Sequence, residues 1–238
     1  MSYYPDFFQN LPTLAGFDDE PPVPAMSDRV LVIFTEEPEE YVAPEHVNSD
    51  EWGCVIAGRI SLTVNGETTV HEAGSTFFVP QGSPHSMTHA AGTVAFTVFE
   101  DADRFELKRT RPRHEVIPRR SGRARTLDVP VFPEFLDKLA RFDLPEEEGW
   151  ARSLSDGGQM LLFTEPLGGS SNDLSEGAEW GFIITGRCDI TIDGKTISYG
   201  AGESYLIPGG VPNHKRNHPG LIAVDVFEKP DQFTDLVD

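Results

Sequence analysis

Apolar and polar residues alternate one by one along several short stretches of the chain, the pattern of β-strands with one buried face. The clearest stretches are residues 60–64 and 188–192. Asn65-Gly66 and Asp193-Gly194 follow them directly, and both pairs tolerate the positive φ angles of a type I′ hairpin turn. A further apolar run, 75–79, stops at a proline, which cannot donate a ladder hydrogen bond. The pattern predicts an all-β sandwich or barrel.

The same pattern occurs twice along the chain. Residues 51–89 align without a gap with residues 179–217, at an offset of 128 positions and with 14 identities in 39 positions. Agreement over this length predicts two copies of one structural unit. We expect domains at 1–105 and 132–238, joined by a linker at 106–131.

Each copy is preceded by a stretch with helical periodicity. Large apolar side chains repeat on one face of that stretch in both copies: Tyr4, Phe7, Phe8 and Leu11, then Phe132, Phe135, Leu136 and Leu139. Pro5 suits the first turn of a helix. We therefore expect a short amphipathic helix that packs against the barrel of its own unit.

Two residue spacings recur in both copies, and they resemble the two motifs of the cupin family. The first motif is Glu, six residues and Gly, found at 51–58 and 179–186. The second is Gly, five residues, Pro-x-Gly, two residues and His, which residues 74–85 match completely. Residues 202–213 match it except at the last position, where Asn213 replaces the histidine.

This resemblance implies an all-β fold of two tandem jelly-roll (cupin) β-barrels, each with a short N-terminal helix and a pocket at its mouth. Members of the family commonly bind a divalent metal and act as dioxygenases, decarboxylases, isomerases, epimerases or cyclases. Other members only bind small ligands.

The first barrel holds the candidate metal ligands. Cupins with a metal usually place His-x-His shortly before the motif glutamate; here one register of that comparison offers His46, and the other offers Glu45. We expect His46, Glu51 and His85 to bind one divalent ion, with Fe, Mn, Ni, Co or Zn all suited to imidazole and carboxylate ligands.

The same barrel offers candidate proton-transfer groups and two alternatives without a metal. His89 lies four positions after His85 on the same side of a strand, and we assign proton transfer to His89 or Glu45, beside Glu51. In one alternative, His85 and His89 are pocket-wall residues that hydrogen-bond one another, a water or Glu51. In the other, burial raises the pKa of Glu51, which then acts as a general acid or base by itself.

The second barrel is poorer in ligands. Glu179 and Asn213 stand where the first barrel has its glutamate and histidine, and asparagine is a weak ligand for a transition metal. His214 is shifted by one residue and faces the other side of the strand unless a bulge follows Pro212. We expect a degenerate pocket of Glu179, Asn213 and His214 that holds no metal.

The composition limits the partners. The chain has 19 Lys and Arg against 39 Asp and Glu, a formal net charge of −20, which disfavours binding to nucleic acid or an anionic membrane. No apolar run is long enough for a transmembrane helix, and the start does not resemble a signal peptide. Two cysteines do not make a disulfide framework, so we expect a cytoplasmic protein.

The positive charge is concentrated in one segment. Residues 104–125 hold nine Lys or Arg and two acidic residues, whereas the rest of the chain is strongly acidic. We interpret this segment as a connector that neutralises the acidic surfaces it crosses. An alternative is that one of its arginines reaches a pocket and pairs with an anionic substrate.

Together these features favour a metal-dependent isomerase, cyclase or dioxygenase that acts on a small oxygenated metabolite in the first barrel. The alternative is a non-catalytic bicupin that binds a small ligand without metal. The expected partner is a small molecule, and a homodimer stays open as the oligomeric state.

Overall fold

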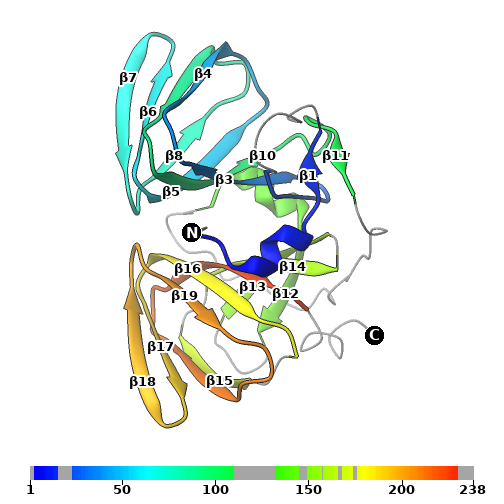
Figure 1. Cartoon of the computed structure of the whole chain (residues 1–238), viewed down its shortest axis with the longest axis vertical. Coiled ribbons are helices and arrows are strands. Elements are labelled where there is room, and N and C mark those ends of the chain that lie inside the picture. Colours follow the sequence, from blue (N-terminus) through cyan, green and yellow to red (C-terminus); the bar gives the residue numbers. More distant parts are fainter. Residues whose placement is uncertain are drawn as a thin grey trace. The chain divides into compact units, whose positions relative to one another are not determined.

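The computed structural model describes residues 3–15, 23–109, 132–144, 149–156, 158–165, 168–173 and 176–229. The chain divides into two compact units, Met1–Thr110 and Arg111–Asp238 (Figure 1). Residues 110–131, most of the predicted linker, lie outside the described part.

The first unit consists of two main antiparallel sheets. Five strands form one sheet in the order β2 (Ala25–Ser27), β3 (Leu31–Glu37), β10 (Thr93–Phe99), β5 (Glu51–Ala57) and β8 (Thr76–Val79). Four strands form the other in the order β4 (Tyr41–His46), β9 (His85–His89), β6 (Arg59–Val64) and β7 (Glu67–Glu72). A small pair, β1 (Thr13–Leu14) and β11 (Leu107–Lys108), completes the unit.

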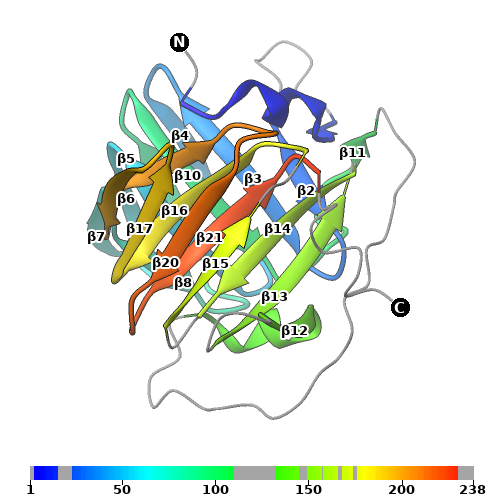
Figure 2. The same cartoon turned by 90° about the horizontal axis from the view of Figure 1, so that it is seen from below.

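The second unit repeats this plan (Figure 2). Its larger sheet has the order β12 (Ala140–Leu144), β13 (Gly149–Asp156), β14 (Gln159–Thr164), β21 (Ile222–Phe227), β16 (Glu179–Thr185) and β19 (Ser204–Ile207). Its smaller sheet has the order β15 (Gly169–Asp173), β20 (Asn213–Asn217), β17 (Arg187–Ile192) and β18 (Lys195–Gly200). The predicted all-β fold of two tandem jelly-roll units is confirmed.

Each unit encloses an apolar core between its two sheets. In the first unit the buried cluster is Val55, Ile60, Leu62, Phe77, Val79, Met87 and Ala95. In the second unit it is Ile183, Cys188, Ile190, Tyr205, Ile207, Leu221 and Ala223. Six positions correspond at the offset of 128; the seventh is Met87, whose counterpart in the repeat is Lys215. The two clusters therefore correspond in position, and the one position that leaves the apolar cluster in the repeat is that of Met87.

The hairpin turns agree with the prediction from sequence. Asn65 and Asp193, at the tips of the β6–β7 and β17–β18 hairpins, have φ angles of 51° and 50°. A left-handed conformation at these positions matches the twist of the flanking strands, so the hairpins form with tight two-residue turns.

The predicted N-terminal helices are shorter than expected. They are 3₁₀-helices of five residues each, η1 (Asp6–Asn10) and η2 (Glu134–Lys138). Pro12 disfavours helical geometry at the residue before it, and Leu11 is extended with ψ 153°, which ends η1 after little more than one turn. The predicted apolar faces are nevertheless buried. Phe8 in η1 packs against Phe34, and Phe132, just before η2, packs against Phe163, each within its own unit. No helix in the described part of the chain is long and apolar enough to cross a membrane.

A glycine in β5 makes room for an aromatic ring of the core. Gly53 lies directly opposite Phe77 in β8, and a Cβ added at Gly53 would lie 2.2 Å from the Phe77 ring atom Cζ. Gly181 and Tyr205 repeat the arrangement in the second unit, also with a separation of 2.2 Å to the ring. The ring occupies the space of the missing side chain, so any larger residue has to displace it.

We predict that Gly53→Ala lowers the free energy of unfolding by about 1–3 kcal/mol, because overpacking forces the Phe77 ring to move. Urea denaturation followed by tryptophan fluorescence measures the change. Gly200→Ala is the matched control, since the nearest atom to its Cβ is a flexible carboxylate oxygen of Glu203 at 3.7 Å. Phe77→Leu in the Gly53→Ala background should recover part of the loss; equal effects at Gly53 and Gly200 would contradict the packing argument.

Candidate metal centre

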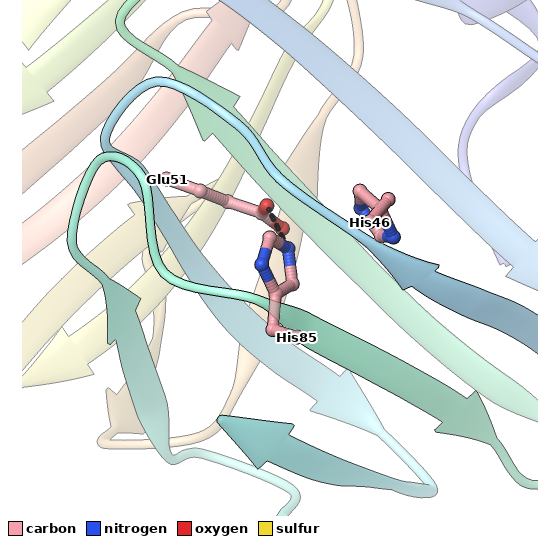
Figure 3. Close-up of side chains that lie close together, drawn as sticks. All are labelled: His46, Glu51 and His85. Carbon is pink, nitrogen blue, oxygen red and sulfur yellow. Dashed lines mark hydrogen bonds and ion pairs between the residues drawn. The ribbon is translucent and has the colours of Figure 1, made fainter. Parts of the chain in front are cut away.

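Three side chains from three strands of the first unit converge at the start of β5. His46 ends β4, Glu51 begins β5 and His85 begins β9, and Figure 3 shows Glu51 and His85 pointing toward one another with His46 beside them. One ligand atom from each residue lies within 4.8 Å of those of the other two. Glu51 and His85 are buried, with 2% and 1% of their surface exposed, and His46 is half-buried. The cluster therefore has one side near solvent.

A β-bulge brings His46 into this cluster. Ala43 lies opposite Met87 and His46 lies opposite His85, so three steps along β4 match two steps along β9. Without the extra residue, the alternation of side chains would turn Glu45 inward and His46 outward. Pro44 lies in the bulge, and β4 is an edge strand; bulges and edges are where a strand tolerates proline.

Backbone carbonyls orient both imidazoles in the same way. Nδ1 of His46 lies 2.7 Å from the carbonyl oxygen of Pro44, and Nδ1 of His85 lies 2.9 Å from that of Ser83. Because a carbonyl only accepts, each Nδ1 carries the hydrogen and Nε2 is left as the coordinating atom. A hydrogen bond from the non-ligating ring nitrogen is the usual support of a metal-binding histidine.

The carboxylate of Glu51 is held by an amide and an imidazole. Asn48 Nδ2 donates to Glu51 Oε2 at 2.6 Å, and His85 Nε2 lies 3.2 Å from the same oxygen. The hydrogen bond with Glu51 raises the pKa of His85, although burial opposes the shift. His85 Nε2 therefore faces a negative charge that favours a proton or another cation at this position.

The residues fit a divalent first-row metal. Two imidazole nitrogens and one carboxylate are the donor set of metal sites that keep positions open for other ligands. In addition, Asn48 Oδ1 is buried and accepts no hydrogen bond from the described residues. An oxygen without a donor next to the cluster is consistent with a polar or cationic group that completes the site.

The two predicted proton-transfer residues lie apart from this cluster. Glu45 is exposed on the outer side of the bulge. His89 is buried at the far end of β9, about 13 Å along the strand from His85, and its ring packs edge-on against Tyr41. Burial lowers the pKa of His89 to about 4, with a small opposing effect of Glu51, so the ring is neutral at pH 7.

The second unit arranges its corresponding residues differently. Glu179 and Asn213 are buried, and Asn213 Nδ2 donates to the carbonyl oxygens of Asp173 and Val211 at 3.3 and 3.4 Å. β15 and β20 pair one for one, with Asn172 opposite His214 and Asp173 opposite Asn213. No bulge turns His214 inward; its Nδ1 lies 3.0 Å from Asn172 Oδ1 on the outer face.

A lysine occupies the interior of the second unit next to Glu179, the glutamate that both copies share. Lys215 Nζ donates to Glu179 Oε1 at 2.9 Å, to the Tyr205 hydroxyl at 2.5 Å and to Asp225 Oδ1 at 3.4 Å. The Tyr205 hydroxyl in turn donates to Glu179 at 3.0 Å and contacts Asp225. Thr164 Oγ1 donates to the other Asp225 oxygen at 3.4 Å. All three N–H groups of the ammonium have acceptors.

The charges of this network stabilise one another. Burial alone lowers the pKa of Lys215, but Asp225 and Glu179 more than offset that effect and raise it well above its usual value. Burial raises the pKa of Glu179, and Lys215 opposes the shift. The lysine is therefore charged at pH 7 and neutralises one of its two neighbouring carboxylates.

Prediction from sequence missed this network because it compared only metal-ligand residue types. The signal is present in the repeat: Met87, Phe77 and Thr97 of the first copy become Lys215, Tyr205 and Asp225 in the second. The three substitutions all fall on inward-facing positions of different strands. Two of them add a polar group to an apolar side chain, and the third replaces the hydroxyl of Thr97 with the carboxylate of Asp225. These three changes occur together in the second copy, and together they indicate that its interior is ionic.

We predict that Lys215→Met, which introduces the residue of the first copy, lowers the free energy of unfolding by about 3–5 kcal/mol. The reason is that Glu179 and Asp225 would stay buried without their cation. Guanidinium denaturation of the intact chain measures the loss. The triple variant Lys215→Met, Glu179→Gln, Asp225→Asn removes the charges together and should be more stable than the single variant. A triple variant less stable than Lys215→Met would contradict the ionic account.

Comparisons with known proteins place both units in one family. The sequence profile described as Cupin domain matches residues 32–100 and again residues 162–224. No curated protein sequence matches the chain. Among solved structures, AerE from Microcystis aeruginosa is 13% identical, with 91% of this chain and 96% of that one covered and a TM-score of 0.39.

Oxalate decarboxylase from Bacillus subtilis, in a study of its Mn(II) centres, is 17% identical over 85% of this chain and 70% of that one, with a TM-score of 0.36. A variant of the same decarboxylase is 14% identical over 87% and 73%, also with a TM-score of 0.36. Structural likeness at this level carries no argument about function.

Proposed function

Because the chain belongs to the cupin domain family, with one matched region in each unit, we propose that it is a metal-dependent enzyme of small-molecule metabolism. Its first unit would bind one divalent ion, Fe, Mn, Ni, Co or Zn, through His46, Glu51 and His85. The reaction we propose is the isomerisation, cyclisation or dioxygenation of a small oxygenated metabolite.

The orientation of the two histidines is the observation that carries this proposal. Each imidazole gives its Nδ1–H to a carbonyl two residues earlier, which leaves both Nε2 atoms free to coordinate. His85 Nε2 lies 3.2 Å from Glu51 Oε2, and one ring nitrogen of His46 lies within 4.8 Å of the ligand atoms of the other two residues. A pocket-wall histidine needs no such fixed tautomer, whereas a ligand does. The agreement between two histidines on different strands supports a metal site over two unrelated buried rings.

The bound ion would act as a Lewis acid that polarises a carbonyl, carboxyl or hydroxyl oxygen of the substrate. The protein's own groups have separate tasks. Asn48 Nδ2 holds Glu51 in position at 2.6 Å and leaves the second carboxylate oxygen available. Val79, opposite Glu51, belongs to the apolar core, and Val64, opposite His85, packs against it; this core keeps water away from the buried side of the cluster. Access is from the side of His46, the half-buried ligand.

The second unit would have no metal of its own. Its glutamate already has a cation, the Lys215 ammonium at 2.9 Å, and that cation cannot be exchanged. Asn213 and Asp173 face one another across β20 and β15 where the first unit has His85 and His46. We propose that this unit supports the fold, and that catalysis is confined to the first unit.

We predict one divalent ion per chain in protein purified without chelator, measured by inductively coupled plasma mass spectrometry. His85→Ala and His46→Ala should each abolish stoichiometric binding, because two remaining ligands are too few to hold the ion.

Two matched substitutions are the controls for this prediction. Asn213→Ala removes the equivalent residue of the second unit, and Glu45→Ala removes the exposed carboxylate next to His46; both should leave one ion per chain. The proposal of a metalloenzyme would be contradicted if the purified protein holds less than one ion per chain and the addition of Fe, Mn, Ni, Co or Zn does not raise this content to one. That result would favour the ligand-binding alternative.

A further inference from the structure

Arg104 follows β10, and its guanidinium packs against two aromatic rings. Its Cζ lies 5.0 Å from the ring centroid of Phe99 and 4.9 Å from that of Phe105. A cation over aromatic faces is held in place without using its N–H donors. The side chain is therefore positioned while its hydrogen-bonding edge is still available.

The rings place this guanidinium on the side of the sheet where Glu51 lies. Phe99 is directly opposite Glu51 in the β10–β5 pair, and opposed residues of antiparallel strands project from the same face. The electrostatics agree with this placement. Burial lowers the pKa of Arg104, and the charges of Glu51 and Asp101 oppose that shift. The hydrogen bond to Glu51 raises the pKa of His85, and the charge of Arg104 is among the effects that oppose the rise. Arg104 is thus within electrostatic reach of two members of the metal cluster.

Arg104 has no carboxylate partner at ion-pair distance among the described residues, and its Nε is buried without an acceptor. A buried donor without an acceptor is costly, so its retention calls for an explanation. The other basic residues of the first unit do not share this environment, since Arg29, Arg59, Lys108 and Arg109 are exposed. One half-buried cation next to the cluster stands out in a chain whose net charge is −20.

We propose that Arg104 binds the carboxylate of the substrate, and that the substrates of the first unit are therefore small carboxylic acids. This inference rests on the proposed function, because it assigns the ligand of the same site. The planar guanidinium pairs with a carboxylate through two parallel hydrogen bonds, which would satisfy the buried Nε. A neutral metabolite of the same size would leave that donor unpaired, so the arginine selects for an anion.

Isothermal titration calorimetry with malonate, and with the neutral analogue malonamide, tests the proposal. Both ligands are titrated into the protein as purified, into protein stripped of metal with a chelator, and into Zn(II)-reloaded protein. Arg104→Gln should weaken malonate binding in the stripped protein by at least about tenfold, the loss expected for a charge-assisted hydrogen bond. Malonamide binding should not change.

Two further variants separate recognition from general charge and from folding. Arg104→Lys keeps the charge over the rings but not the two-pronged hydrogen bonding, and should bind malonate with an affinity between those of wild type and Arg104→Gln. Arg59→Gln removes an exposed charge of the same unit and should bind as wild type does. Urea unfolding midpoints of all three variants show whether a loss of binding reflects a loss of folding.

The inference is overturned if wild type binds malonate no better than malonamide, or if Arg104→Gln binds malonate as wild type does. These results are distinct from a failure of the metal assignment. Protein that takes up no metal but binds malonate through Arg104 would contradict the proposed metalloenzyme and support the anion site. If the protein takes up one ion per chain and Arg104→Gln binds malonate as wild type does, the result would support the metalloenzyme and contradict the anion site.

Discussion

A carboxylate buried inside each β-sandwich is the constraint on which both interiors depend. Glu51 and Glu179 begin equivalent strands, β5 and β16, and lie next to apolar cores that correspond at six of their seven positions. An ionised carboxylate in such a place is costly unless hydrogen bonds and an opposite charge compensate it. Each copy therefore had to supply partners for the same group, and the choice of partners determines what each interior can do.

The two copies meet this constraint in chemically different ways. Around Glu51 the partners are an imidazole and an amide, and a second imidazole lies close by. Neither partner is a permanent cation, so a proton on His85 or an exchangeable cation can compensate the carboxylate. Around Glu179 the partner is an ammonium that is covalently part of the chain and has all its hydrogen bonds satisfied. A duplicated fold has thus kept its glutamate twice while the surrounding charge diverged.

Small features of the backbone control these differences. The bulge at Pro44 decides that His46, not Glu45, faces the cluster, and β15 has no register shift against β20. The stretches from β4 to Glu51 and from β15 to Glu179 therefore look alike in sequence. They nevertheless present different side chains to the interiors of their units. In the same way, a glycine opposite Phe77 or Tyr205 leaves the space that the aromatic ring occupies. In the second unit that ring brings a hydroxyl to the ionic network.

By itself, the sequence determined the duplication, the all-β fold and the hairpins, because periodicity and spacing are local properties; His46, Glu51 and His85 were candidates only through the resemblance to cupin motifs. It overestimated the two leading helices, which end after about one turn, and it could not choose between His46 and Glu45. Only the tertiary structure decided the facing of those residues, since one inserted residue inverts the alternation of a strand. The tertiary structure also brought Lys215 to Glu179. In the first unit it placed Arg104 over Phe99, which lies opposite Glu51. Contacts of this kind join segments distant in sequence, so they depend on how the strands pair in the sheets.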